Sequence, residues 1–179
     1  MNAEVHYKYW TDPDMEKLAK ATTFLELACI ALAVIARMPR DLHMVSGPIS
    51  TGGVGTVEGN CKVFKGMIEL LALHCHLNMF SQMPFEKRMA ELSIKWHAEN
   101  PTETYCTPIL DDFYTPVFRS GRICAVHFLD GWGSSFGAKW EHDNCELWNI
   151  QRIFLTKESS DLALWFGSEG ELVTEEVPE

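Results

Sequence analysis

The chain has 179 residues, which is the size of one domain and enough to bury a hydrophobic core without metal ions or disulfides. Apolar residues make up 46% of the chain and charged residues 22%, which excludes disorder or collagen-like structure for most of it. The net charge is −10, and residues 157–179 carry −6 of it. Because binding a polyanion requires clustered Lys and Arg, we expect no nucleic-acid polymer as a partner.

The six cysteines form no Cys-x-x-Cys pair, and the first residues lack the basic and apolar regions of a secretion signal. These features predict a cytoplasmic protein whose thiols are reduced. The apolar stretch 24–38 is interrupted by Glu26, and its uncharged run is about half of the ~20 residues that a bilayer span needs. We therefore expect a buried or interface helix there and no membrane partner.

An irregular segment is predicted over residues 1–12. Asp12-Pro13-Asp14 is a typical helix start, because proline fits the first turn and acidic side chains favour the positive end of the helix dipole. Apolar residues then recur at helical spacing as far as Arg37, which predicts one long helix. Its wide apolar face must be covered by the body of the protein or by a second subunit, so we expect a homodimer or a larger homo-oligomer.

Pro39 ends this helix, and the short apolar run 43–46 predicts a buried strand. A glycine-rich loop reaches to Asn60 and is followed by a helical pattern over residues 63–74 and a strand candidate at 77–81. The succession of strand, loop, helix and strand is a βαβ unit, and such units build parallel sheets.

Further along the chain, the patterns predict helices over 85–98, 111–120 and 137–148 and strands over 122–129 and 152–155. We therefore expect an α/β fold with three αβα layers and a Rossmann- or flavodoxin-like parallel sheet of four to five strands. The predicted organisation is an N-terminal helical extension (1–41), an α/β domain (42–156) and an acidic C-terminal tail (157–179) that is solvated and partly disordered.

Two loops each follow a predicted strand and precede a predicted helix, the position at which open α/β sheets bind ligands. Residues 46–53 read Ser-Gly-Pro-Ile-Ser-Thr-Gly-Gly, with glycines that allow close approach and hydroxyls that can donate to phosphate or sugar oxygens. This is neither a Walker loop nor a GxGxxG fingerprint, so a glycine-rich surface turn is an equally good interpretation.

The second loop, 131–141, places the small residues Gly137 and Ala138 at a helix start and Glu141 one turn further on. The Glu141 carboxylate can then face the same cleft as the Ser135 hydroxyl. The alternative is a solvated glutamate that the helix dipole favours.

Together these motifs resemble the nucleoside 2-deoxyribosyltransferase-like superfamily, especially its small uncharacterised bacterial and phage members. The shared patterns are Gly-Pro near the start and G-W-x-x-S-x-G-A-x-x-E later. In this chain they are carried by Ser46-Gly47-Pro48-Ile49-Ser50, Asn60, Phe64, Asp130-Gly131-Trp132, Ser135, Gly137-Ala138 and Glu141. The resemblance covers residues 42–155.

The resemblance implies cleavage or transfer at the N-glycosidic bond of a nucleoside or nucleotide. Members of known activity use a helix-borne glutamate as the nucleophile at the sugar C1′, and by position this residue is Glu141. Retaining glycosyl transfer also needs a second group for the proton of the leaving base. The resemblance implies an aspartate for this role, for which Asp111 and Asp112 are the candidates, and Asp112 is preferred.

Ser135 stands where related nucleoside 5′-monophosphate N-glycosidases have a serine and base-exchanging transferases have an aspartate. The resemblance therefore implies a (deoxy)nucleoside 5′-monophosphate as substrate, because an aspartate there would repel the phosphate. The residues expected to bind the substrate and its phosphate are Ser46, Gly47, Pro48, Ile49, Ser50, Gly52, Asn60, Ser135, Gly137 and Ala138.

No metal or cofactor is expected. His74-Cys75-His76 is the nearest approach to a metal motif, but residues i and i+2 do not share a helix face, and no second ligand pair lies at a usual spacing. Two other functions stay open on the sequence. One is a nucleotide-binding or sensor module that uses the same pocket without catalysis, and the other is an interaction protein with a vestigial cleft.

Overall fold

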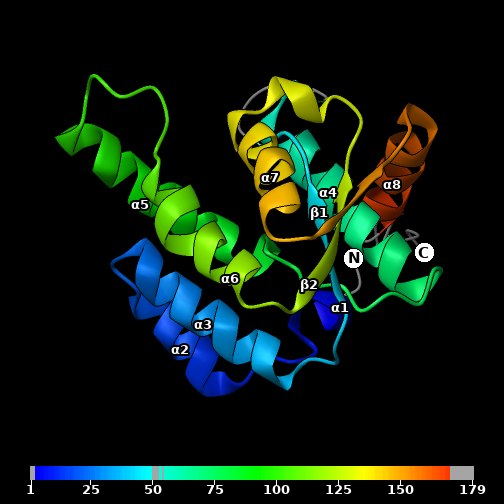
Figure 1. Ribbon diagram of the computed structural model, residues 1–179, viewed down its shortest axis with the longest axis horizontal. Helices are drawn as coiled ribbons and strands as arrows, with labels where there is room; N and C mark the ends of the chain where they lie inside the picture. Colours follow the sequence, from blue (N-terminus) through cyan, green and yellow to red (C-terminus); the bar gives the residue numbers. More distant parts are fainter. Residues whose placement is uncertain (1–2, 50–52, 54, 170–179) are drawn as a thin grey trace, which may run out of the picture.

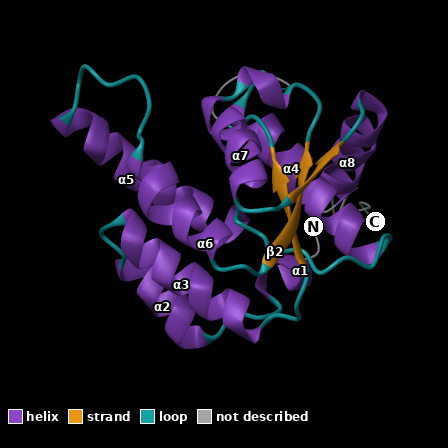
Figure 2. Cartoon of the chain, in the orientation of Figure 1, coloured by secondary structure: helices purple, strands orange, loops and turns teal. Residues whose placement is uncertain are grey.

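The computed structural model describes residues 3–49, 53 and 55–169, which form an α/β fold around a small parallel sheet. The strands are β1 (Leu42–Ser46), β2 (Ile123–Phe128) and β3 (Gln151–Phe154), in the order β1-β2-β3. Figure 2 shows them side by side in the upper part of the molecule. The three strands were all predicted, and the parallel pairing of each with its neighbour is confirmed.

The sheet is smaller than the four to five strands expected. The predicted strand at 77–81 makes only one parallel bridge, between Met79 and His43, with hydrogen bonds of 2.9 Å from His43 N to the Asn78 carbonyl and from Phe80 N to the His43 carbonyl. The chain then turns into the short 3₁₀ helix η1 (Met83–Phe85), in which Pro84 has no N–H to continue a ladder. The segment therefore lies beside β1 without becoming a full strand.

The two faces of the sheet are covered by different helices. On one face, Val45 packs in a core cluster with Met67 of α4 (Val57–Leu73) and Ala163 of α8 (Lys157–Glu169). On the other face, Met44 belongs to the cluster that contains Cys145 of α7 (Phe136–Leu147). Figure 1 shows α7 on one side of the strands and α4 with α8 on the other.

The remaining helices lie mostly on the α7 side, where they extend the larger core cluster. The helices predicted over 63–74, 85–98 and 137–148 are confirmed as α4, α5 and α7, with bounds that differ by a few residues. The segment predicted as one helix over 111–120 forms a π-helix, η2 (Ile109–Tyr114), followed directly by the α-helix α6 (Thr115–Arg119). The helix α5 spans Glu86–Glu99, and the short 3₁₀ helix η3 spans Trp132–Ser134.

The N-terminal region holds three helices where one long helix after an irregular segment was predicted. They are α1 (Ala3–Tyr7), α2 (Asp12–Lys20) and α3 (Phe24–Arg37). The break before α3 follows from a capping box. The Thr23 side chain accepts a hydrogen bond from Glu26 N at 3.2 Å, and the Glu26 carboxylate accepts from Thr23 N at 3.1 Å. These bonds start a new helix because they satisfy backbone donors that a continuous helix would use internally.

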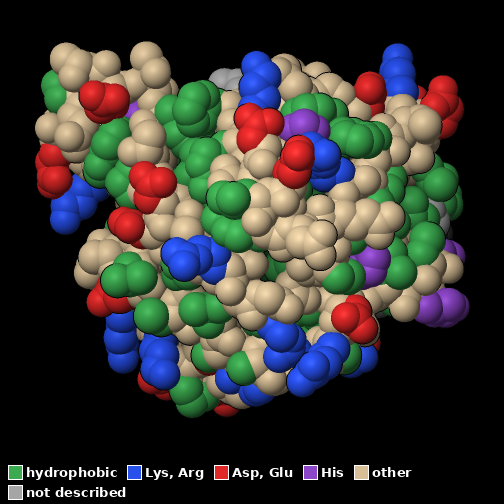
Figure 3. Space-filling model, viewed as in Figure 1, with side chains coloured by type: hydrophobic (Ala, Val, Ile, Leu, Met, Phe, Trp, Pro, Cys, Tyr) green, Lys and Arg blue, Asp and Glu red, His purple; other side chains and the backbone are tan. Residues whose placement is uncertain are grey.

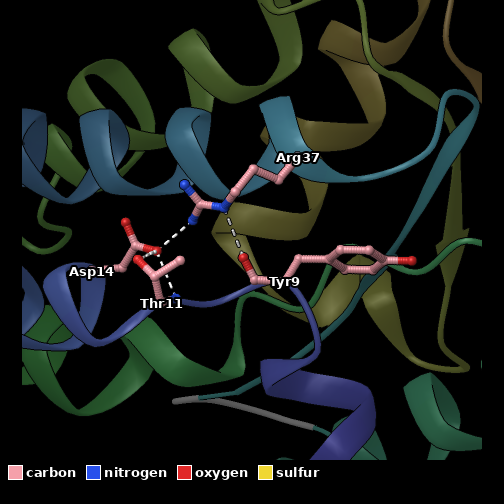
Figure 4. Close-up of polar contacts among 4 residues, drawn as sticks. All are labelled: Tyr9, Thr11, Asp14 and Arg37. Carbon is pink, nitrogen blue, oxygen red and sulfur yellow. Dashed lines mark hydrogen bonds and ion pairs between the residues drawn. The ribbon is translucent and has the colours of Figure 1, made fainter.

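A buried carboxylate ties α2 to α3 and to the chain before them. Asp14 is only 4% exposed, and its Oδ2 accepts hydrogen bonds from Thr11 N (2.9 Å) and Thr11 Oγ1 (2.7 Å) and pairs with the Arg37 guanidinium. Arg37 Nε donates in addition to the Tyr9 carbonyl at 3.0 Å (Figure 4). One side chain thus caps α2 and fixes its position against the last turn of α3.

The apolar face of α3 is covered largely within the chain. Leu27, Ala28 and Ala31 are fully buried and belong to the large core cluster, whereas Leu25 remains exposed. A second subunit is therefore not needed to cover this helix. The oligomer stays a prediction, but the apolar face of α3 no longer supports it. No helix in the part of the chain that the structure describes is both long and apolar enough to cross a bilayer.

Residues 157–179 differ from the solvated tail that was expected. The first half forms α8, and Ala163 is buried against α4, so this half is part of the fold. Within the apolar patch, Ala163 and Leu164 pack in the core cluster with α4, whereas Leu162 and Trp165 are exposed. Residues 170–179 lie outside the described part.

Two histidines meet inside the sheet. His43 Nδ1 lies 2.9 Å from His127 Nε2, and burial first, then the charge of His43, lowers the pKa of His127 to about 4 from the usual 6.5. Between pH 6.5 and pH 4 the unfolded chain is therefore protonated at this histidine, whereas the folded protein is not. The contribution of His127 to stability thus falls as the pH falls through this range.

We expect His127→Gln to weaken this pH dependence. The difference in Tm between pH 7 and pH 5, measured by circular dichroism, should differ between wild type and variant by about 3 °C or more. The same substitution at the exposed His74 serves as the control. Superimposable pH profiles for wild type and His127→Gln would contradict the expectation.

Candidate functional site

A cavity of about 740 Å³ lies between α7, which packs on the sheet, and α5. Its walls come from the loop after β1, α4, α5, the segment 104–114 and the start of α7. In Figure 3 the part that carries α5 in Figure 1 stands apart from the α7 part across a notch lined by hydrophobic side chains. Three exposed apolar residues, Val57, Ile94 and Phe136, are among the residues that line the cavity.

Glu141 projects into this cavity from the second turn of α7 and is 5% exposed. The Ser46 hydroxyl, at the last residue of β1, donates a hydrogen bond to Glu141 Oε2. Ser135 begins α7 as its N-cap, where its hydroxyl accepts from Ala138 N at 3.3 Å. The two motifs that the sequence singled out are therefore joined by a direct contact between side chains 95 residues apart.

The environment of Glu141 favours its neutral form. The pKa of this carboxyl is raised to about 8: burial is the largest cause, the hydrogen bond from Ser46 acts in the opposite direction, and the negative charge of Glu86 adds to the rise. A carboxyl with such a pKa at the wall of a cavity is a candidate for acid-base or nucleophilic chemistry. The alternative of a solvated first-turn glutamate does not fit its burial.

Glu86 is a second carboxyl in the same cavity, and sequence reasoning missed it. It is the first residue of α5 and lines the cavity, and burial raises its pKa to about 7. No motif surrounds it in the sequence. The only available signal was an acidic residue at a helix start, which is common on protein surfaces.

Tyr105 and Tyr114 add an aromatic wall to the cavity. The Tyr105 ring packs against that of Phe136 with a centroid separation of 4.5 Å. Burial raises the pKa of both phenols, and the charges of Glu141 and Glu86 raise it further, so both tyrosines keep their protons at neutral pH. They can stack on a flat ligand and donate hydrogen bonds to it.

A side chain at either of two predicted glycines would force a neighbouring side chain to move. A Cβ atom at Gly137 would lie 2.8 Å from the Tyr105 hydroxyl oxygen, and one at Gly47 would lie 2.9 Å from Leu129 Cβ. Real Cβ atoms do not approach other atoms so closely. Gly137 therefore lets Tyr105 reach the start of α7, and Gly47 lets the ends of β1 and β2 lie together.

Most of the predicted binding residues gather around Glu141. Ile49, Ser135 and Ala138 line the cavity together with Gly47 and Gly137. Pro48 and Asn60 line an adjoining cavity of about 450 Å³, which shares Ser134 with the first, and Asn60 Nδ2 donates to the Ile49 carbonyl at 3.0 Å. Ser50 and Gly52 lie outside the described residues.

Asp112 is not brought to this site. It is exposed on η2 and does not line either cavity. The same holds for Asp111. Consecutive residues of a helix point in different directions, and η2 turns its apolar residues Leu110 and Phe113 inward, which leaves the two aspartates outside. Glu86 therefore occupies the cavity in which a second acid was expected.

The cavity carries little positive charge. Among the described residues that line it, Lys87 is the single lysine or arginine. An anionic group would instead meet the amides at the start of α7 and the Ser135 hydroxyl, whose proton is available because its oxygen is the acceptor in the helix cap. In the described ranges, no cluster of three His, Cys, Asp or Glu side chains could hold a metal ion.

Comparison with known proteins found no family model, no curated protein and no solved structure that matches this chain. The likeness to the deoxyribosyltransferase-like superfamily therefore stands on the motif residues alone.

Proposed function

We propose that the cavity binds a (deoxy)nucleoside or its 5′-monophosphate and that Glu141 acts as the nucleophile in cleavage of the N-glycosidic bond. The observation that carries the proposal is the buried Glu141 carboxyl, held by the Ser46 hydroxyl at the wall of a cavity that also presents Glu86 and Tyr105. The cavity volume of about 740 Å³ lies in the usual range for small-molecule sites.

The proposed reaction uses the two carboxyls in different roles. Glu141 attacks the sugar C1′ while Glu86 gives its proton to the leaving base, which departs with the electrons of the C–N bond. A water molecule then attacks C1′, Glu86 takes up one of its protons, and Glu141 is released. Nucleoside and water thus become free base and sugar, and both carboxyls return to their starting states. A second base in place of water would give base transfer.

The assignment of roles follows from the position of Glu141 in the shared motif, where the resemblance implies the nucleophile. The hydrogen bond from Ser46 favours the ionised form of Glu141, although burial outweighs it and raises the pKa to about 8. Glu86 is the other carboxyl in the cavity, and its pKa of about 7 lets it both give and take up a proton near neutral pH.

The experiment that tests this function is an assay of base release. The purified protein is incubated with ribo- and deoxyribonucleosides of each base, with and without a 5′-phosphate, and the free base is separated by chromatography. We expect release from at least one substrate, and from the 5′-monophosphate if the start of α7 holds the phosphate. No release and no binding across the panel would overturn the proposal.

A non-catalytic binding module is a second candidate, and one observation favours it. With a pKa of about 8, Glu141 is mostly neutral at pH 7, a state suited to hydrogen bonding with a ligand and poor for nucleophilic attack. This function predicts that a nucleoside or nucleotide raises the Tm of the protein in a dose-dependent way without release of base.

A further inference from the structure

A buried polar cluster ties the N-terminal helix α1 to two other segments, and the proposed reaction makes no use of it. His6 of α1, Glu69 of α4 and Ser81, which lies just before η1, are 6%, 5% and 5% exposed. His6 Nδ1 lies 2.7 Å from Ser81 Oγ, and His6 Nε2 lies 3.3 Å from Glu69 Oε1. Burial of polar side chains costs free energy unless they find partners, so such a cluster calls for an explanation.

The partners of the cluster fix the positions of its protons. Ser81 Oγ accepts a hydrogen bond from Met83 N at 3.3 Å, so the Ser81 hydroxyl can donate its own proton to His6 Nδ1. The other imidazole nitrogen then carries a hydrogen and faces the Glu69 carboxylate. Burial lowers the pKa of His6, the attraction of Glu69 opposes this, and the charge of Lys65 lowers the pKa further, so His6 is neutral at pH 7.

A path of hydrogen bonds leads from His6 to Glu86. The Met83 amide donates to Ser81, and the Met83 carbonyl accepts from the backbone N–H of Glu86, where η1 passes directly into α5. Glu86 is the first residue of α5, and its side chain lines the cavity. Three successive hydrogen bonds therefore connect the imidazole of α1 to the backbone of the carboxyl residue at the cavity wall.

Aromatic packing holds the same turn at its other end. Trp10 follows the end of α1 by three residues and packs on Phe85 with a ring centroid separation of 5.1 Å. Phe85 is fully buried and immediately precedes Glu86. Residues 6–10 therefore contact both ends of the turn 81–85, from which α5 begins.

We propose that His6 is a positioning residue, which acts through Ser81 to hold the turn 81–85 and, with it, Glu86 at the cavity wall. The inference rests on the proposed function, in which Glu86 is the acid, and adds the residues that fix this acid in place. None of the described residues of the N-terminal segment 3–10 lines the cavity, so their effect on it is indirect.

Two substitutions cut the path at different points. His6→Phe fills a similar space without the two polar contacts, and Ser81→Ala removes only the link between His6 and the turn. The carboxyl of Glu86 is titrated by ¹³C NMR in wild type and variants, and its signal is identified by its loss in Glu86→Gln. We expect its titration midpoint to fall from about 7 toward the ordinary 4.5, by about one pH unit or more, because a carboxyl that leaves the cavity wall regains water.

A matched serine separates this effect from a general loss of stability. Ser120 also accepts a hydrogen bond from the amide two residues further on, Arg122 N at 3.2 Å, and it donates to the Val117 carbonyl at 2.6 Å. Ser120 does not line the cavity, so Ser120→Ala should leave the midpoint of Glu86 unchanged. The double variant of His6 and Ser81 should lower the midpoint no further than either single variant, because both cut one path.

An unchanged midpoint in folded His6→Phe or in folded Ser81→Ala would overturn the proposal, and so would an equal fall in Ser120→Ala. A thermal melt shows which variants fold. Ser81→Ala is the smaller change and decides the proposal if His6→Phe does not fold.

The titration needs no substrate, so it separates this inference from the proposed function. A lowered midpoint in both variants without base release from any nucleoside would retain the position of Glu86 and reject the proposed function. Base release by the wild type together with an unchanged midpoint in both variants would retain the function and reject the inference. Where base release is found, we expect kcat of Ser81→Ala at pH 7 to fall about tenfold with little change in KM, because the path reaches the acid and not the substrate.

Discussion

Glu141→Gln is expected to reduce base release by about a thousandfold or more. Glutamine keeps the size of the side chain and can still accept the hydrogen bond from Ser46, but it cannot attack C1′ and form a glycosyl ester. The measurement is the initial rate of base release on the substrate found in the panel. Release that survives this substitution would reject Glu141 as the nucleophile, even if the protein proves to be a glycosidase.

The pH profile supplies an independent control for the same residue. Because the pKa of Glu141 is about 8, the ionised form falls roughly tenfold for each pH unit below that value. Because the reaction also needs protonated Glu86, whose pKa is about 7, base release should rise from pH 6 to a maximum between pH 7 and pH 8 and fall above it. Glu86→Gln should remove the fall at higher pH. A rate that falls steadily from pH 6 to pH 8 in the wild type would contradict the assigned roles.

Asp14→Ala is expected to lower the stability of the protein substantially. Three hydrogen-bonding contacts end on this one carboxylate, and its removal leaves the Thr11 donors and the Arg37 guanidinium without their partner (Figure 4). Arg37 is partly exposed, so solvent screens part of the loss. We expect the free energy of unfolding to fall by about 2 kcal/mol, measured by chemical denaturation.

The pH dependence of Asp14 gives this prediction a second measurement. Burial raises its pKa, but the bonds from Thr11 and the charge of Arg37 outweigh burial, so the folded pKa lies below the usual 3.8. The stabilisation is therefore present above pH 3.8 and is lost as the pH falls through the folded pKa. The exposed capping residue Glu26 is the matched control, because Glu26→Ala removes a cap without a buried ion pair. An equal loss for both variants would argue against the buried pair.

The order of elements along the chain was largely predictable, and the number of strands was not. Alternation and apolar runs identify a segment as extended, and 77–81 is indeed extended beside β1. Whether it becomes a strand depends on the turn that follows, where Pro84 and η1 end the pairing. The break between α2 and α3 was readable from Thr23 and Glu26, a capping box that a continuous apolar periodicity obscured.

The residues of the candidate site also divide into those that the sequence predicted and those that it did not. Residues in local motifs, such as Ser135 and Glu141, were found because a helix start and its first turns are close in sequence. Glu86 was not found, because its role comes from its position in a cavity whose walls are formed by segments far apart in the chain. Asp112 was chosen for its chemistry, and only the direction in which η2 turns its side chains places it outside.

The π-helix η2 also affects the shape of the cavity. A π-helical turn is in effect an α-helix that holds one extra residue, and η2 ends on Tyr114, which forms part of the aromatic wall. The extra residue is what makes the turn π-helical, so deleting the exposed Asp112 should close η2 into a regular α-helical turn and keep Tyr114 at the cavity. A deletion inside the regular helix α7 would instead rotate the residues that follow it by about 100°, so the shape of the site tolerates a change of chain length in η2 better than in α7.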